Sequence, residues 1–146
     1  MTVIERSALV PHRPADMFAL VNDVERYPEF LPWCIGASVT PLAVDEVQAT
    51  LQVKRGPFRS AFTTQNRLRV GEQIHMQLHD GPFRHLAGIW RFEPVGERGA
   101  RVSFHVDFEF KNALTATAFG SLFQDMCGTM VDAFVARARQ VYGAGH

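Results

Sequence analysis

Apolar and polar residues alternate with a period of two along most of the middle of the chain. The clearest run is 102–110, where every second residue is valine or phenylalanine and the residues between are polar. Successive side chains of a β-strand point to opposite faces, so this period is typical of a strand with one buried face. The same alternation, or a β-branched run, occupies 2–10, 46–54, 58–69, 73–79 and 86–92.

Short turn sequences separate these runs. They are rich in Gly, Pro and Asp, and they fall at 44–46, 55–57, 71–72, 80–82 and 96–99. Connections this short join antiparallel neighbours, because parallel strands need a long crossover. The alternation therefore predicts one antiparallel meander of about seven strands, with one polar and one apolar face.

The last third of the chain changes to helical spacing. The segment 112–142 contains no proline, and its apolar residues recur at steps typical of a helix: Leu114, Phe119, Leu122, Phe123, Met126, Met130, Phe134 and Val141. Such a stripe predicts an α-helix with one buried side. A helix of about thirty residues is roughly 45 Å long, so the sheet is the element long enough to cover it.

Two short helices are expected between the first and second strands. Pro14 suits a first helical position, and Asn22 and Asp23 can close this helix and cap a second one through Tyr27. The fold class is therefore α+β: a helix-grip fold, with a curved sheet wrapped around the long C-terminal helix and 1–146 as a single domain. A twisted sheet cannot touch one helix along its whole length, so a cavity can remain between them.

Composition narrows the functional classes. Hydrophobic residues make up 47% and charged residues 21% of the 146, as in ordinary globular domains. Lys plus Arg equals Asp plus Glu at 15 each, which argues against DNA binding and against any domain whose main role is to neutralise a phosphate backbone, but leaves room for a local basic face. Cys34 and Cys127 have no CxxC partner and are expected to be reduced thiols. With no leader and no long apolar window, the sequence predicts a soluble cytoplasmic protein, at most peripheral to the inner face of a membrane.

The apolar face of the sheet and the helix stripe supply candidate ligand contacts. They combine flexible methionines with flat aromatic walls, a mixture that suits a prenylated quinone. These residues are Phe62, Met76, Trp90, Phe92, Phe104, Phe119, Phe123, Met126 and Met130. Gly120 and Gly128 are expected to leave gaps along the helix. The alternative for most of this face is a plain hydrophobic core.

The insert between the first two strands carries a second apolar group. Phe30, Leu31 and Trp33 lie beside Pro32. One interpretation is a ligand-binding mouth that sits at a membrane interface, a region that aromatic side chains favour. The other is a hydrophobic mini-core that anchors the two short helices, and the sequence leaves both open.

Polar residues on the inner face are few. Ser60, Thr64 and Asn66 face inward by alternation and can bond to quinone oxygens. Arg137, near the buried stripe, either extends outward or meets a polar ligand head. No nucleophile motif, paired acid and base or metal-ligand spacing is found, and the histidines are expected to face solvent. We therefore expect no catalytic residue, no metal and no required cofactor.

Five basic residues are expected on the outer face and at the end of one hairpin: Lys54, Arg55, Arg59, Arg67 and Arg69. The simplest interpretation is a solvated strand face. A docking surface for lipid headgroups or ribosomal RNA is the alternative. The lack of interleaved aromatic residues favours lipid over RNA.

Three stretches share their order and spacing with a known family. They are DVERYPEFLPWC at 23–34, GPFRHLAGIWRF at 81–92, and FEFKN at 108–112 leading into MVDAFVARA at 130–138. Together they span most of the chain. They resemble the coenzyme-Q-binding and ribosome-association-toxin branch of the START-like (SRPBCC) superfamily, whose members are of the polyketide cyclase/dehydrase and lipid-transport type.

The resemblance implies a non-enzymatic carrier of a hydrophobic ligand, with ubiquinone as the bound molecule and respiration as the process supported. The partners implied are an isoprenoid quinone or other lipid and, transiently, a membrane surface. The alternative that the resemblance implies is a toxin that binds a ribosomal subunit and blocks 70S formation, as half of a toxin–antitoxin pair. A small polyketide cyclase or dehydratase is the third.

Overall fold

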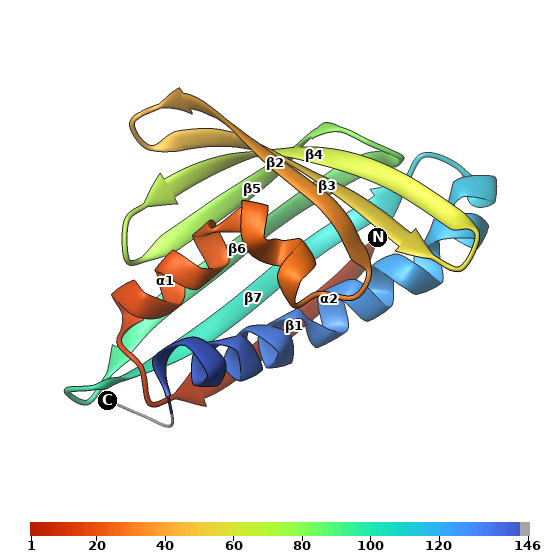
Figure 1. Cartoon of the computed structure of the whole chain (residues 1–146). Coiled ribbons are helices and arrows are strands. Elements are labelled where there is room, and N and C mark those ends of the chain that lie inside the picture. The colour runs from red at the N-terminus through yellow and green to blue at the C-terminus, as the bar shows by residue number, and fades with distance from the viewer. Residues whose placement is uncertain (144–146) are drawn as a thin grey trace.

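The chain forms a seven-stranded antiparallel sheet that curves around one long helix (Figure 1). The computed structural model describes residues 1–143. The elements in chain order are β1 (Thr2–Val10), α1 (Pro14–Asn22), the 3-10 helix η1 (Val24–Glu29), β2 (Cys34–Ala43), β3 (Glu46–Arg55), β4 (Phe58–Arg69), β5 (Gln73–Asp80), β6 (Phe83–Val95), β7 (Gly99–Phe110) and α2 (Ala113–Tyr142). The strand order β1-β7-β6-β5-β4-β3-β2 is a meander from β2 to β7, with β1 added beside β7. The predicted α+β helix-grip fold is confirmed.

Helix α2 lies along the inner face of the sheet because its apolar stripe is continuous. Its buried side chains recur at helical spacing: Phe119, Leu122, Phe123, Met126, Met130, Phe134 and Ala138. The helix begins where Asn112 accepts a hydrogen bond from the Thr115 amide at 2.8 Å, which satisfies one of the free donors of the first turn. The inner-face residues of the strands supply the matching apolar surface.

The insert forms as α1 followed by η1, and it differs from the expectation at its second part. Pro14 occupies the first turn of α1 as predicted. The Asp23 side chain makes no capping hydrogen bond to η1, and this element continues past Tyr27, through Pro28, to Glu29. A 3-10 helix of six residues, about two turns, tolerates Pro28 because few backbone donors are needed in so short an element. The Tyr27 hydroxyl donates to the Val21 carbonyl and ties η1 to α1.

Two aromatic clusters fill the space between helix and sheet. One surrounds the first half of α2, where Phe119 and Phe123 contact rings from β4, β6 and β7. The other surrounds Phe134, whose ring contacts Tyr27 and Phe30 of the insert and Trp90 of β6 at centroid distances of 5.3 to 5.4 Å. The stretch of α2 between these clusters carries smaller and more flexible side chains.

Five residues are placed differently from the sequence expectation. Leu114 and Val141, which the helical spacing assigned to the buried stripe, lie in the first and last turns of α2 and are 80% and 50% exposed. Gly120 and Gly128 face Phe110 and the Arg6 guanidinium, respectively, so they accommodate packing and leave no gap. Arg55 is not on the outer face, because its position in the alternation turns it toward α2, where it pairs with Asp125 at 2.8 Å.

Among the described residues, no helix combines the length and the apolar character that crossing a bilayer requires.

Candidate functional site

The inner face of the sheet has one row of residues without a ring. The register of the strands aligns Val47, Asn66, Met76, Gly88 and Val106 side by side across β3 to β7. The neighbouring inward row on one side contains Trp90 and Phe104 in the same strands β6 and β7. Gly88 contributes no side chain to this row, and the methyl end of Met76 fills the space over it only in part, so a small hollow remains beside the rings.

Helix α2 and η1 close this hollow into an apolar cavity of about 60 Å³. Phe123, Met126, Cys127 and Met130 line it from α2, and η1 contributes two further side chains. The strands contribute Ala49, Leu51, Phe62, Thr64, Asn66, Met76, Leu86, Gly88, Trp90, Phe104 and Val106. Counted as the space open to the centre of a water-sized sphere, one water molecule needs about 10 to 15 Å³, so the cavity has room for a few atoms of a ligand.

One polar pair faces the cavity. Thr64 donates its hydroxyl to Oδ1 of Asn66 at 2.7 Å, and both residues are buried. The Asn66 amide nitrogen donates to no acceptor among the described residues. Every side-chain nitrogen or oxygen among these residues that is fully buried has a hydrogen-bond partner, so the Asn66 nitrogen is not fully buried. The amide nitrogen is therefore reached from the cavity, where it can donate to an oxygen of a bound molecule.

The titratable groups of the lining are neutral. Burial raises the pKa of the Cys127 thiol to about 12. Burial, helped by the nearby Cys34 and Asp23, raises the pKa of the Tyr27 hydroxyl far above its ordinary value. The lining contains no Asp, Glu, His, Lys or Arg. The cavity therefore offers apolar surface and one amide donor, and no ionised acid or base at neutral pH.

The structure brings together most of the residues that the alternation pattern assigned to a ligand. Those in the cavity wall are Phe62, Thr64, Asn66, Met76, Trp90, Phe104, Phe123, Met126 and Met130. Whether they contact a ligand stays a prediction.

Other predicted site residues lie outside the cavity wall. Phe92 packs edge-on against Phe18 of α1, and Phe119 stacks within the aromatic cluster at the start of α2. Ser60 is a half-buried inward residue further along β4. These positions share the inward face with the cavity residues but are too far along their strands or helix to reach it.

The apolar group of the insert packs as a mini-core in which Phe30 and Trp33 stay partly accessible, so its role as a ligand-binding mouth stays a prediction. Leu31 is 1% exposed, and Phe30 and Trp33 are partly buried against the core. Phe30 is covered by Phe134 on one side and by the Arg137 guanidinium, 4.8 Å from the ring centre, on another.

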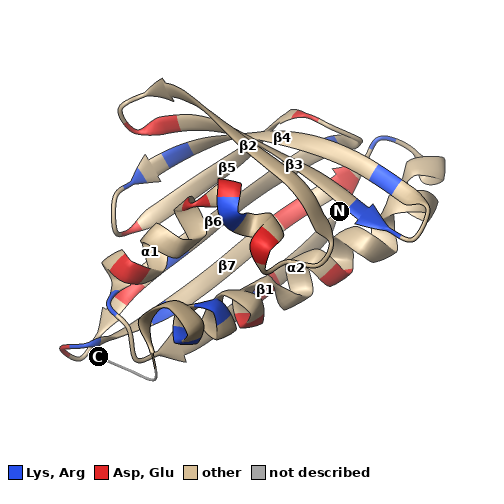
Figure 2. Cartoon of the chain, in the orientation of Figure 1, with Lys and Arg blue, Asp and Glu red and all other residues tan. Residues whose placement is uncertain are grey.

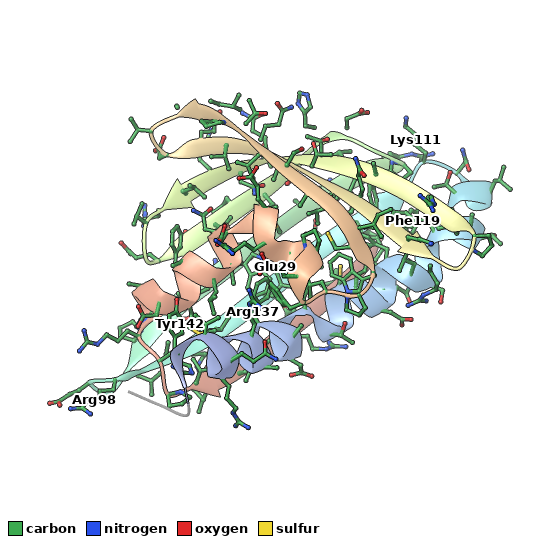
Figure 3. The ribbon with its side chains drawn as sticks, viewed as in Figure 1. Glu29, Arg98, Lys111, Phe119, Arg137 and Tyr142 are labelled. Carbon is green, nitrogen blue, oxygen red and sulfur yellow. The ribbon has the colours of Figure 1, made fainter. Side chains whose placement is uncertain are left out.

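Arg137 connects the insert to α2 instead of reaching into the cavity. Its Nη2 donates to Oε1 of Glu29 at 2.8 Å (Figure 3). Glu29 also accepts from Arg26 within η1 at 3.2 Å. This contact lies between η1 and α2, the two elements that cover the cavity, so opening the cavity at this side separates Arg137 from Glu29.

Sequence reasoning missed several residues of the cavity wall. Val24, Tyr27, Ala49, Leu51, Leu86, Gly88, Val106 and Cys127 line the cavity without having been singled out. The alternation already placed the strand members of this set inward, and a glycine inside a strand signals an open space or close approach. Val24 and Tyr27 lie in the family stretch 23–34, but periodicity does not place them in the cavity wall, because their position depends on how η1 docks.

The histidines between residues 1 and 143 are not arranged as a metal site; His146 lies outside the described residues. His75 and His79 are exposed on the outer face as expected, whereas His85 and His105 hydrogen bond to Asp107 and Glu5, respectively. Within residues 1–143, no three or more His, Cys, Asp or Glu side chains are grouped so that they could hold a metal ion.

Comparisons with known proteins agree with this architecture. A model of the family described as polyketide cyclase / dehydrase and lipid transport matches residues 10–135. The ribosome association toxin RatA of Escherichia coli is 42% identical over 99% of this chain and 91% of its own length. The mitochondrial coenzyme Q-binding protein COQ10 of Drosophila melanogaster is 29% identical over 94% of this chain and 59% of its own length.

A solved structure shows the same fold at low sequence identity. The ZhuI aromatase/cyclase of Streptomyces sp. R1128 superimposes with a TM-score of 0.82 over 99% of both chains, at 15% identity. This likeness concerns the fold alone. With the family match over 10–135 and the RatA relative over nearly the whole chain, the chain belongs to the polyketide cyclase / dehydrase and lipid transport family.

Proposed function

We propose that this protein binds a hydrophobic small molecule that carries a hydrogen-bond acceptor, and that the molecule is an isoprenoid quinone such as ubiquinone. The observation that carries the proposal is the apolar cavity with the free Asn66 amide donor in its wall. A quinone ring has flat apolar faces that match Trp90 and Phe104, and carbonyl and methoxy oxygens that match the amide. The quinone is a carried ligand, not a cofactor.

The cavity must widen to admit such a ligand. Its volume of about 60 Å³ is well below the roughly 300 to 1,000 Å³ of sites that enclose small molecules. Three methionines in its wall, Met76, Met126 and Met130, can change rotamer at low cost. Movement of η1 away from α2 provides further room, at the cost of the partly exposed Glu29–Arg137 contact.

The role proposed is carriage without catalysis. The wall has no ionised acid or base, and the relatives RatA and COQ10 are named as a toxin and a binding protein. The name of COQ10 supports a quinone ligand, and transient contact with a cytoplasmic membrane surface is the step at which the quinone would be exchanged. Turnover of an aromatic or polyketide substrate by the purified protein would instead favour a cyclase.

Replacing Asn66 by leucine is expected to weaken quinone binding by about fivefold to tenfold, because one buried hydrogen bond contributes roughly 1 kcal/mol. A ubiquinone with a short tail is titrated into the protein, and quenching of tryptophan fluorescence reports binding beside Trp90. Organic extraction of the freshly purified protein, followed by mass spectrometry, identifies the native ligand.

The matched control is Gln77→Leu, which makes the same change from amide to apolar side chain on the exposed outer face of β5. It should leave the dissociation constant unchanged. Equal affinities for wild type and both variants would exclude Asn66 from the site, and a wild-type protein that takes up no quinone or other lipid would refute the carrier proposal.

A second function is favoured by a separate observation, the 42% identity to RatA over nearly the whole chain. As this second function, we propose that the protein binds a ribosomal subunit and hinders association of the two subunits. Overexpression should then lower the 70S peak and raise the free-subunit peaks in sucrose gradients. Unchanged gradients at a level of protein comparable to that of ribosomes would contradict this function and leave the carrier proposal intact.

A further inference from the structure

The outer face of the sheet carries a row of arginines that takes no part in the cavity. The register aligns Arg69, Gln73, Arg91, Ser103 and Ser7 across five adjacent strands, β4, β5, β6, β7 and β1. This row contains two cations, one amide and two hydroxyls, and no acidic residue. Arg101, in β7, lies one outward position beyond Ser103. We call Arg69, Arg91 and Arg101 with these polar residues the arginine row.

The three arginines are available to a partner. Each is exposed, and none of them forms an ion pair within 4.0 Å with any residue of 1–143. By contrast, Arg67 and Arg55 are engaged by Glu46 and Asp125. Figure 2 shows Lys and Arg interspersed with Asp and Glu over the molecule, so five aligned residues free of acids are a local feature of a chain with zero net charge. Arg101, outside these five, lies opposite Glu93 in the register.

Two shallow hollows lie along the row. One, of about 350 Å³, lies over β4 and β5 and includes Arg69 and Gln73 in its wall. The other, of about 440 Å³, lies over β1, β6 and β7 and includes Arg91, Arg101 and Ser103. Both hollows are polar. Their walls also include acids, Asp45 and Glu46 in the first and Glu5 in the second, so a phosphate group would lie at the arginine side of each hollow. Arginine suits this ligand because its planar guanidinium can donate two parallel hydrogen bonds to one phosphate.

We propose that the arginine row docks the phosphate backbone of double-stranded RNA in a ribosomal subunit, an inference that rests on the ribosome-directed function. Strands are about 4.8 Å apart, so Arg69 and Arg91, two strands apart, are about 10 Å from one another at their backbones and can contact different phosphates. The outward positions of β4 to β7 carry no Phe, Tyr or Trp, so single-stranded bases have no ring to stack on. Duplex RNA is bound through phosphates and 2′-hydroxyls, for which the arginines, the amide and the serines are suitable partners.

Binding is tested with the full chain, using a fluorescent RNA hairpin with a stem of about 16 base pairs and purified ribosomal subunits as probes. The variant R69Q/R91Q/R101Q removes the row. The control K54Q/R59Q/R84Q removes the same three charges elsewhere on the surface, all from residues without an ion pair among those described. Circular dichroism and the quinone titration verify that both variants keep their fold and cavity.

The expected result is that R69Q/R91Q/R101Q binds hairpin and subunits about tenfold or more weakly, while the control binds as wild type. The slope of log affinity against log salt should fall in magnitude by about 2 to 3, because each arginine neutralises one phosphate. Equal weakening of both triple variants would overturn the proposal, since general attraction would then explain the binding.

Three further outcomes separate this proposal from the functions above. Subunit binding that survives R69Q/R91Q/R101Q would overturn the arginine row as the RNA-docking surface and leave the ribosome-directed function standing. Row-dependent binding to the hairpin, with unchanged sucrose gradients, would support the row and contradict that function. Binding to vesicles containing phosphatidylserine, with none to the hairpin, would overturn the proposal in favour of a membrane-facing surface.

Discussion

Gly88→Val is expected to abolish quinone uptake while the protein stays folded. Gly88 is the member of the ring-free row that leaves the cavity open, and its missing side chain faces the cavity. A Cβ at this position would lie 2.8 Å from the terminal methyl of Met76, which must move, and 3.4 Å from the His105 carbonyl. The methyl of Met76 is the end of a flexible side chain, so it can yield into the same cavity and fill it further.

The stability effect of this substitution should be small, within about 1 kcal/mol of wild type. Valine favours strands more than glycine does, and filling an apolar void adds contacts, whereas the crowding of Met76 costs a similar amount. Thermal unfolding measures the net change in stability, and the fluorescence titration measures quinone uptake in the same preparation.

The control for Gly88→Val is Ala87→Val, the adjacent position of β6, whose side chain faces outward. It should bind quinone as wild type does. If Gly88→Val binds quinone with unchanged affinity, the ligand does not occupy this cavity, and the site must lie elsewhere on the protein.

Phe134→Ala is expected to lower the free energy of unfolding by about 3 to 5 kcal/mol, the range for removing a fully buried ring. Phe134 is 0% exposed and lies where α2, η1 and β6 meet. Its ring contacts Tyr27, Phe30 and Trp90 at 5.3 to 5.4 Å, so its loss removes three aromatic contacts and leaves a void that rigid neighbours cannot fill.

Urea unfolding followed by circular dichroism measures the free energy of unfolding of Phe134→Ala and of wild type. Phe134→Leu, which keeps most of the apolar volume, should cost less than the alanine variant. A loss below about 1 kcal/mol for Phe134→Ala would show that this cluster adds little to stability, because large effects are expected of well-packed rings. The alanine variant should also loosen η1, which protease digestion in the 23–33 segment would detect.

Much of the fold could be predicted because the hydrophobic pattern within each segment is enough to define its secondary structure and its buried face. The alternation in 102–110 defines a strand whichever residues lie beside it, and the stripe from Phe119 to Ala138 defines a helix face. Turns of two to four residues then leave antiparallel pairing as the available connection. Residues predicted to face inward, such as Thr64 and Asn66, do so because the period of a strand determines its faces.

For the candidate site, the sequence predicted which residues lie on the inner face of the sheet and on the buried side of the helix, but not which of them line the cavity. Phe92 and Phe119 have the same pattern as Trp90 and Phe123, yet only the latter pair lines the cavity. Which inward residues surround a void depends on the register between strands and on where α2 crosses them, and neither is encoded in a single segment. For the same reason Gly120 and Gly128 were assigned to gaps that Phe110 and Arg6 fill.

The sequence by itself determined the elements, their inward and outward faces, and the family. The tertiary structure alone decided that Gly88 lies beside Asn66 and Met76, that Tyr27 and Met130 close over them, and that Arg69, Arg91 and Ser103 form a row on the other face. The physical reason is that periodicity is a property of neighbours in the chain. Cavities and charged surfaces arise from residues that are distant in sequence and are brought together by strand register and helix packing.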